Sequence, residues 1–283
     1  MNHLFPRDTS KYITTLRNPV EQFESLFNYV GFGTVYGFGQ DPTESLKRFL
    51  ENGIEFKDMF KIPSSCLARN PMSFDLGLDY RFYQNITAIK GYIAFLEKEF
   101  DLVMISDYFD ESVVLMKRLL CWEFDDILYI KANERIDKER AVDLSEHVRE
   151  DIKRWNKADV FLYQHFNQTF WRKIQNEGED FYNDLATFRH KKTEMKRLCL
   201  TNGTKNQLYF PHKYVKVPHL KQNLSGETKV NCDRMTRFEL QYVEYLREKQ
   251  HLKLKGIFQA KPEEDDRRKL SWDVASELKY DNV

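Results

Sequence analysis

Residues 11–27 read KYITTLRNPVEQFESLF, and this stretch decides the fold. A β-prone run, YITTL, ends in Arg17. Asn18 and Pro19 follow at once, and Asn is a favoured N-cap while Pro is a favoured first residue of a helix. Apolar residues then recur at helical spacing, at Val20, Phe23, Phe27 and Val30. The stretch therefore predicts a strand that turns sharply into a helix.

Arg17 and Ser25 are the candidate binding residues of this stretch. Arg17 ends the predicted strand, and open α/β sheets bind ligands at the carboxyl ends of their strands. Ser25 follows eight residues later, on a different helix face from the apolar stripe. A guanidinium and a neutral hydroxyl together suit a phosphate group. Taken alone, the pair is more typical of an ordinary surface, where Arg and Ser are mostly exposed, and the flanking blocks described next reverse this preference.

Three long blocks of sequence resemble the galactose-3-O-sulfotransferase family. They are FPRDTSKYITTLRNPVEQFESLFNY, FDLVMISDYFDESVVLMKRLLCWEFDDILYIKAN and WNKADVFLYQHFNQTFW, and the resemblance runs from about Phe5 to about Gln250. Golgi sulfotransferases that use the sulfate donor PAPS (3′-phosphoadenylyl sulfate) hold its 3′-phosphate with an Arg at a strand end and a Ser eight residues on. The resemblance therefore implies that Arg17 and Ser25 bind the 3′-phosphate of PAPS.

The resemblance also implies a fold and a reaction. The fold is α/β, a parallel sheet flanked by helices in a P-loop-like sulfotransferase domain over residues 1–260, with a charged tail at residues 261–283. The reaction moves sulfate from PAPS to the 3-hydroxyl of a terminal galactose on a glycolipid or glycan, at the lumenal side of the Golgi membrane. The residues agree with this class, since the buried-type strand DLVMIS (101–106) precedes a helical segment that starts with acidic residues.

The other half of a donor site is missing from the sequence, which contains no G-x-x-x-x-G-K-[ST] loop. In the family, the loop for the 5′-phosphosulfate and a His thought to act as base lie upstream of the segment that matches Phe5. We therefore expect a chain without its membrane anchor, first strand, donor loop and base, so the catalytic residue is unknown and the chain alone is expected to be inactive. His3 could be nominated as base, but a terminal surface residue is the favoured interpretation.

Two alternatives to the enzyme remain. The chain could be a non-catalytic fragment that binds PAP (the desulfated donor), a glycan or a partner subunit. A nucleotide-dependent kinase relative is disfavoured, because Walker motifs and acidic magnesium ligands at the expected spacings are absent from the sequence.

The amino-acid composition limits which other classes of protein this chain could belong to. Hydrophobic residues make up 41% of the 283, enough for a sizeable core. Lys plus Arg equals Asp plus Glu, at 44 each, so the basic signature of a nucleic-acid-binding protein is absent. No apolar run approaches the roughly 18–20 residues of a membrane span, and the start, MNHLFPRDTS, lacks the apolar region of a signal peptide. Four N-x-S/T sequons nevertheless point to the secretory pathway, at Asn85, Asn167, Asn202 and Asn223.

The four cysteines, Cys66, Cys121, Cys199 and Cys232, allow three pairings. Cys199 and Cys232 flank a polar stretch that we interpret as loop-rich, and we expect these two to form a disulfide. Cys121 lies in an apolar helical run and fits a buried thiol. No C-x-x-C or Cys/His cluster occurs, so we expect no metal site.

Two glycine-rich or aromatic stretches could also take part in a site. GFGTVYGFG (31–39) has the look of a phosphate loop but follows a helix, so Gly31 is better interpreted as its C-cap. Residues 62–83 are rich in turn-forming and aromatic residues. They suit either a loop whose rings stack on a sugar or a packed surface loop.

Charged stretches leave a further choice open. Asp107, Asp110 and Glu111 could bind an acceptor hydroxyl or favour a helix N-terminus. Residues 189–197 and 212–221 are basic, which suits either solvated surface or a wall beside an anionic donor.

Overall fold

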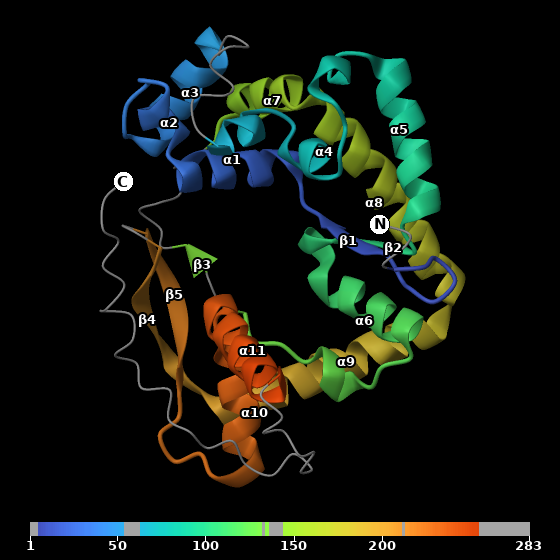
Figure 1. Ribbon diagram of the computed structural model, residues 1–283, viewed down its shortest axis with the longest axis vertical. Helices are drawn as coiled ribbons and strands as arrows, with labels where there is room; N and C mark the ends of the chain where they lie inside the picture. The colour runs from blue at the N-terminus through green and yellow to red at the C-terminus, as the bar shows by residue number, and fades with distance from the viewer. Residues whose placement is uncertain (1–4, 54–62, 132–133, 136–143, 211–212, 255–283) are drawn as a thin grey trace. The chain divides into compact units, whose positions relative to one another are not determined.

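The computed structural model describes residues 5–53, 63–131, 134–135, 144–210 and 213–254 (Figure 1). Contacts divide the chain into two units, Met1–Thr236 and Arg237–Val283. His3 and residues 261–283 lie outside the described residues, and a domain boundary at residue 260 stays a prediction.

The elements follow one another in the order that Figure 1 labels. They are β1 (Ile13–Leu16), α1 (Pro19–Val30), α2 (Phe32–Val35), α3 (Pro42–Asn52), η2 (Pro63–Ala68), α4 (Pro71–Asp75), η3 (Tyr80–Phe82), α5 (Ile86–Glu99), β2 (Leu102–Ile105), η4 (Ser106–Tyr108), α6 (Phe109–Leu120), η5 (Phe124–Ile127), β3 (Glu134–Arg135), α7 (Glu146–Trp155), α8 (Lys157–Glu177), α9 (Glu179–Cys199), β4 (Leu200–Phe210), β5 (Lys213–Leu220), α10 (Gly226–Thr236) and α11 (Glu239–Leu254).

The predicted turn from strand to helix is confirmed. β1 ends at Leu16 and α1 begins at Pro19. The side chain of Asn18 accepts the N–H of Val20 at 3.0 Å and so caps the helix. Gly31 closes the same helix with φ of +74°, donating its N–H to the Phe27 carbonyl at 3.1 Å. The cap interpretation of Gly31 therefore holds, and the chain continues directly into α2.

A small parallel sheet and its helices confirm the α/β class. β1 pairs with β2 in parallel, and the register sets Leu16 opposite Ile105. Every residue of β2 is buried, as expected for a strand covered on both faces. The hydroxyl of Ser112 on α6 bonds the N–H of Ile105 at 3.0 Å and its carbonyl at 2.9 Å. Ser112 thus supplies the polar partner that a neighbouring strand would otherwise provide at this position.

Two hydrophobic cores support this sheet and the helix after it. The larger core packs β2 between α6 and α8, with α5 against α8, and contains Phe166, Phe170 and Ile174. The second core joins α1, α3 and α7 through Phe23, Phe27, Phe49 and Ile152. Buried Phe side chains make both cores large relative to the few strands. The helix α1 that follows Arg17 is therefore anchored along its length.

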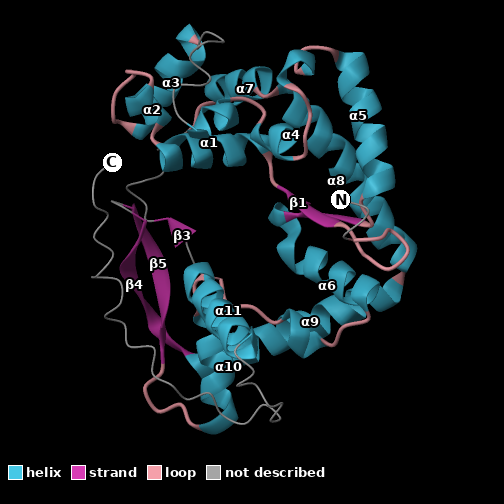
Figure 2. Cartoon of the chain, viewed as in Figure 1, coloured by secondary structure: helices cyan, strands magenta, loops and turns pink. Residues whose placement is uncertain are grey.

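A second sheet, which was not predicted, contains β3, β4 and β5 (Figure 2), and two of these strands, β4 and β5, come from the stretch between Cys199 and Cys232. Its strand order is β3-β5-β4 and both pairings are antiparallel. The stretch we expected to be loop-rich is mostly the β4–β5 hairpin followed by α10. Within the β-prone run YVKV, residues 215–217 (Val, Lys, Val) alternate apolar and polar side chains, which is a short strand signal. The interpretation as loop was wrong because the charged and polar residues of this stretch obscured that alternation.

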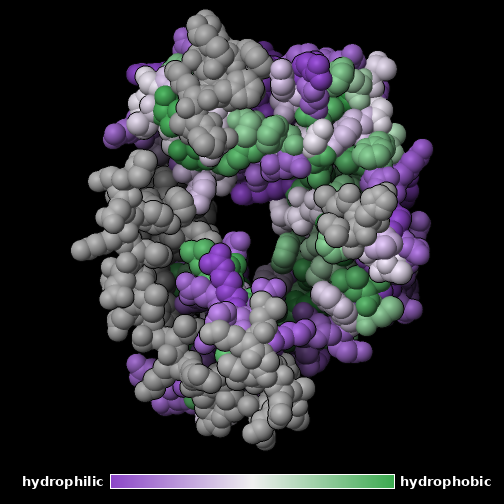
Figure 3. Space-filling view, in the orientation of Figure 1, coloured by the Kyte–Doolittle hydropathy of each residue, from purple (hydrophilic) through white to green (hydrophobic). Residues whose placement is uncertain are grey.

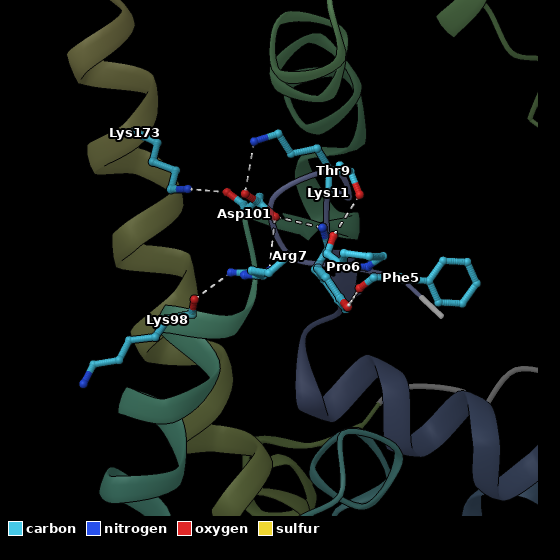
Figure 4. A network of polar contacts seen from close by, with 9 residues as sticks. Phe5, Pro6, Arg7, Thr9, Lys11, Lys98, Asp101 and Lys173 are labelled. Carbon is cyan, nitrogen blue, oxygen red and sulfur yellow. Dashed lines mark hydrogen bonds and ion pairs between the residues drawn. The ribbon is translucent and has the colours of Figure 1, made fainter. Parts of the chain in front are cut away.

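Ion pairs close the amino end of the parallel sheet (Figure 4). Asp101 accepts the N–H of Tyr12 at 2.8 Å and lies 3.4 Å from Arg7 and 3.5 Å from Lys11. Lys173 on α8 donates to the carbonyl of Asp101 at 2.7 Å. Desolvation alone would raise the pKa of Asp101, but the hydrogen bond from Tyr12 and the nearby cations lower it. These cations are engaged with the protein, which leaves the carboxyl end of the sheet as the open end for a ligand.

The surface mixes apolar and polar side chains. On the face shown in Figure 3, hydrophobic residues gather over α1 and α6, beside hydrophilic ones. Tyr29 on α1 is 47% exposed and Phe109 on α6 is 37% exposed. Among the helices that the structure describes, none combines the length and the apolar character needed to cross a membrane.

The second unit is described through α11. Arg237 lies over the rings of Tyr242 and Tyr245, 5.8 and 5.7 Å from their centroids, and Lys249 lies 5.6 Å from the Tyr245 ring. Leu240 and Leu246 are more than half exposed. This helix therefore combines cation–π contacts at Tyr242 and Tyr245 with exposed leucines at positions 240 and 246.

Candidate functional site

A pocket of about 310 Å³ opens at the carboxyl ends of the two parallel strands. Because the register pairs Leu16 with Ile105, Arg17 and Ser106 leave neighbouring strands at the same edge. This is the edge at which open α/β sheets bind ligands. The residues that line the pocket are Thr14, Thr15, Leu16, Arg17, Gln22, Met72, Asp75, Leu76 and Ser106.

Arg17 offers an unpaired cation to this pocket. The residue is half-buried, and its backbone N–H donates to the sulfur of Met72 at 3.5 Å. Its guanidinium forms no hydrogen bond or ion pair with any residue that the structure describes. Since a guanidinium binds a phosphate or carboxylate in a bidentate fork, a free one in a pocket is suited to an anionic ligand.

Ser25 does not line the pocket. Gln22, in the first turn of α1, lines it instead. Ser25 follows Gln22 by three residues and therefore lies one turn further along the same side of the helix. Its half-buried hydroxyl has no partner among the described residues. The structure thus brings Arg17 and Gln22 together and sets Ser25 one helical turn beyond them.

Ser106 and Asp75 are pocket residues that the sequence interpretation missed. Ser106 follows β2 directly, as Arg17 follows β1, so the same strand-end rule applied to DLVMIS could have identified it. Asp75 is the last residue of α4 and comes from a segment that we expected to be a loop. Asp75 is exposed, yet protein atoms around its carboxyl remove part of its hydration and raise its pKa.

The short helix α4 forms one wall of the pocket, and a carboxylate from α8 fixes its amino end. Asp159, 1% exposed, accepts the N–H of Met72 at 3.1 Å and the N–H of Ser73 at 2.7 Å. Burial raises the pKa of Asp159 to about 6, although the hydrogen bonds from Ser73 and Met72 act in the opposite direction. Both bonded N–H groups belong to the first turn of α4, where the helix itself provides no acceptor.

Two buried asparagines extend this contact. Asn70, with a left-handed φ of +49°, donates its N–H to the side chain of Asn156 at 2.7 Å. The side-chain oxygen of Asn70 accepts the N–H of Asp159 at 3.1 Å. The indole of Trp155 donates to the carbonyl of Ala68 at 2.7 Å. The segment before α4 is therefore bound to the junction of α7 and α8, which fixes the pocket wall.

The acidic cluster considered for acceptor binding is engaged within the protein. Asp107 accepts the N–H of Asn18 at 2.9 Å and the hydroxyl of Tyr163 at 3.3 Å. Asp110 accepts the hydroxyl of Tyr129 at 2.7 Å and is also bonded by Lys192. Desolvation alone would raise the pKa of Asp110, but the bonds from Lys192 and Tyr129 lower it.

The basic stretch at residues 189–197 lies on α9 and is partly neutralised by acidic residues of α6 and η5. Arg189 lies 2.8 Å from Glu111, and Lys191 lies 2.9 Å from Asp125. These ion pairs join α9 to α6 and η5. They leave the unpaired Arg17 as the better candidate for an anionic ligand. Most of residues 212–221 form β5.

The sequons differ in their surroundings. Asn85 caps α5 by accepting the N–H of Ala88 at 3.1 Å, and Asn85, Asn202 and Asn223 are all exposed. Asn167 lies within α8, and its side-chain oxygen is buried without a partner among the described residues. A glycan on folded protein is therefore easier to accommodate at the three exposed sites.

The structure joins Cys199 and Cys232 in a disulfide, with Cα atoms 5.4 Å apart, in a cluster with Ile130. Cys66 and Cys121 are free. The expectation that Cys121 is a buried thiol was wrong. The residue is the C-cap of α6 with φ of +54°, and this turn exposes it. In the described part of the chain, no group of His, Cys, Asp or Glu could hold a metal ion.

Comparison with known proteins places the chain among sulfotransferases. Residues 1–250 match the family model described as galactose-3-O-sulfotransferase. Galactosylceramide sulfotransferase of Bos taurus is 37% identical over 194 residues, which cover 68% of this chain and 45% of that protein. Galactose-3-O-sulfotransferase 3 of Mus musculus is 33% identical over 282 residues, covering 93% of this chain and 64% of that protein. The chain spans about half the length of the first of these curated relatives. No solved structure matches it.

Proposed function

The chain belongs to the galactose-3-O-sulfotransferase family, and from this premise we propose that it serves the transfer of sulfate from PAPS to the 3-hydroxyl of a terminal galactose. Arg17 and Ser25 hold the 3′-phosphate of the donor. The observation that carries the proposal is the unpaired guanidinium of Arg17 at the carboxyl end of β1, in a pocket of about 310 Å³.

The chemistry of the pocket supports a phosphate more than a carboxylate or a neutral sugar. A phosphate presents several acceptor oxygens, and here a guanidinium lies beside the neutral side chains of Gln22 and Ser106. Ser25, one turn after Gln22 on α1, adds a further neutral hydrogen-bond donor. Arg17 with these neutral donors can bind a phosphate without a second cation, and the structure describes no second cation in the pocket lining. The same lining also holds one carboxylate, that of Asp75, which the phosphate has to avoid or approach through a hydrogen-bond donor.

We place the acceptor beside α4, which lines the pocket, and the exposed rings of α4 and η3. Phe74, Tyr80 and Phe82 are 39%, 43% and 42% exposed. Exposed rings can stack on the C–H face of galactose while the sugar hydroxyls stay in water. The names of the relatives support galactose as the sugar, in a glycolipid or a glycan.

The compartment we propose is the lumenal side of the Golgi membrane. The disulfide between Cys199 and Cys232 and the exposed sequons suit an oxidising, glycosylating compartment. PAPS is the only co-substrate we propose, without a metal.

A second candidate function is binding without catalysis, to PAP, a glycan or a partner subunit. Its support is the sequence itself, which holds no G-x-x-x-x-G-K-[ST] loop for the 5′-phosphosulfate. The chain would then retain the 3′-phosphate site but lack the groups that stabilise the leaving phosphate.

Calorimetry with PAP and with adenosine 5′-monophosphate, which lacks the 3′-phosphate, tests the proposal. We expect PAP to bind at least about tenfold more tightly, since a charge-assisted contact contributes roughly 1.5–3 kcal/mol. Equal affinities, or no binding of PAP, would overturn it. Radiolabelled PAPS with galactosylceramide and lactosyl acceptors then separates the two functions, because sulfated product requires the enzyme while binding without product indicates the second candidate.

A further inference from the structure

The pocket carries one unpaired cation and one unpaired carboxylate, and they come from separate elements. Arg17 follows β1, while Asp75 ends α4. No ion pair joins them, and the Asp75 carboxylate has no hydrogen-bond partner among the described residues. A ligand in the pocket therefore meets a positive group and an acceptor-only group at once.

Asp75 is held in place from both sides. The first turn of α4 is bonded to Asp159, as described above. After Asp75, the carbonyl of Leu76 accepts the hydroxyl of Tyr92 from α5. The carboxylate is thus presented to the pocket from a backbone whose two ends are anchored.

This arrangement restricts the ligand by charge. A phosphate bound to Arg17 would repel the Asp75 carboxylate, because both are anions in one small pocket. The repulsion is offset when the ligand places a hydrogen-bond donor between its phosphate and Asp75. Protein atoms around the Asp75 carboxylate remove part of its hydration and raise its pKa, and a hydroxyl donor from a ligand would replace the hydrogen bonds lost to water.

A ribonucleoside 3′-phosphate has such a donor in the required place. Its 2′-hydroxyl is on the carbon next to the one that carries the phosphate. We propose that Asp75 accepts a hydrogen bond from the ribose 2′-hydroxyl of the donor nucleotide and makes the pocket selective for ribose over deoxyribose. Carboxylates recognise ribose hydroxyls in this way in dinucleotide-binding folds. The inference rests on the proposed function, since it assumes that Arg17 holds the 3′-phosphate.

Calorimetry with two probes tests it, adenosine 3′,5′-bisphosphate (PAP) and its 2′-deoxy analogue. We expect the wild-type chain to bind PAP about tenfold more tightly than the analogue. Asp75→Ala should reduce this ratio to within about twofold, because the acceptor is gone. Asp75→Asn keeps an acceptor oxygen without the charge and should retain a clear preference for PAP. Asp180→Ala removes an exposed carboxylate on α9 that does not line the pocket, and should leave the ratio unchanged.

Each of the following outcomes overturns the inference. A wild-type ratio near one does so without any variant, so the test does not depend on whether Asp75→Ala folds. A tenfold ratio that survives Asp75→Ala does so as well. Equal binding of PAP and adenosine 5′-monophosphate removes the proposed function and this inference together. PAP binding that needs the 3′-phosphate, but ignores Asp75, removes this inference alone.

Discussion

Asp159 on α8 accepts the backbone N–H of Ser73 at 2.7 Å, across a sequence separation of 86 residues. The same carboxylate accepts the N–H of Met72 at 3.1 Å. Capping of a helix normally comes from the residue just before it, but here it comes from another helix. Because α4 carries Asp75 into the pocket, the contact links the stability of the core to the shape of the candidate site.

Replacing Asp159 with Ala should therefore destabilise the protein. Two buried N–H groups would lose their acceptor, and each unsatisfied group costs about 1–3 kcal/mol. We expect a loss of roughly 2–6 kcal/mol in the free energy of unfolding, measured by urea denaturation. The control Asp180→Ala, at an exposed position, should change stability by less than about 0.5 kcal/mol. Equal stability of the two variants would show that solvent or other protein groups accept the N–H groups of Met72 and Ser73 when Asp159 is absent.

The raised pKa of Asp159 gives stability a pH dependence of known sign. Burial raises the pKa from 3.8 to about 6, so the folded protein keeps a proton that the unfolded chain releases between these values. Stability from this group therefore falls as pH rises through that window. We expect the unfolding free energy of wild type, relative to Asp159→Asn, to decrease from pH 4 to pH 7. A difference that does not change with pH would place the folded pKa of Asp159 near its ordinary value.

Local signals explain which parts of the site could be predicted from sequence. The turn between β1 and α1 depends on Asn18 and Pro19, which act within a few residues of themselves. Arg17 could be placed by the same reasoning. Ser106 follows an equally clear strand, and the strand-end rule that identifies Arg17 applies to it in the same way. Each of these features is set by its immediate neighbours in the chain.

Long-range contacts explain what could not be predicted. The pocket wall depends on the hydrogen bond from Ser73 to Asp159. Local sequence patterns do not predict a contact between residues that are 86 positions apart. Asp107 and Asp110 look like free carboxylates in the sequence, but the folded chain brings partners such as Tyr163 and Lys192 to them. Charge in a sequence shows what a residue can bind, whereas the fold decides whether that capacity is already used.

Expression through a secretory pathway should separate the four sequons. We expect glycans at the exposed Asn85, Asn202 and Asn223, and the lowest occupancy at Asn167, whose side-chain oxygen is buried within α8. Peptide mapping after enzymatic deglycosylation in water labelled with heavy oxygen measures occupancy at each site, because hydrolysis converts a glycosylated Asn into an oxygen-labelled Asp. Full occupancy at Asn167 with bare asparagines elsewhere would contradict this order.

The same peptide maps, prepared without reduction, report on the cysteines. They should show Cys199 linked to Cys232, with free thiols at Cys66 and Cys121. A disulfide sulfur does not react with an alkylating agent, so alkylation before denaturation and without reduction should label the exposed Cys121 and spare the pair. Four free thiols in secreted material would defeat the assignment of an oxidising compartment.

Arg17→Ala should weaken PAP binding on the order of tenfold to a hundredfold, because a charge-assisted contact to phosphate is lost. Arg17→Lys keeps the charge but not the planar fork, so its affinity should fall between those of wild type and Arg17→Ala. Arg172→Ala is the matched control, since Arg172 is exposed on α8 and does not line the pocket. Calorimetry on folded variants measures all three. Unchanged affinity in Arg17→Ala would remove this residue from the site.

The final prediction concerns how Ser25 and Ser106 share the phosphate with Arg17. Ser106 lines the pocket beside Arg17, while Ser25 lies one turn beyond Gln22. A neutral hydrogen bond contributes about 0.5–1.5 kcal/mol, so each Ser→Ala change should weaken PAP binding by about two- to tenfold. Adenosine 5′-monophosphate, measured by competition, should lose nothing, because it lacks the 3′-phosphate. In the Arg17→Ala background each serine effect should shrink, since residues that bind one group are coupled. A serine change that weakens both nucleotides equally would place that serine away from the 3′-phosphate.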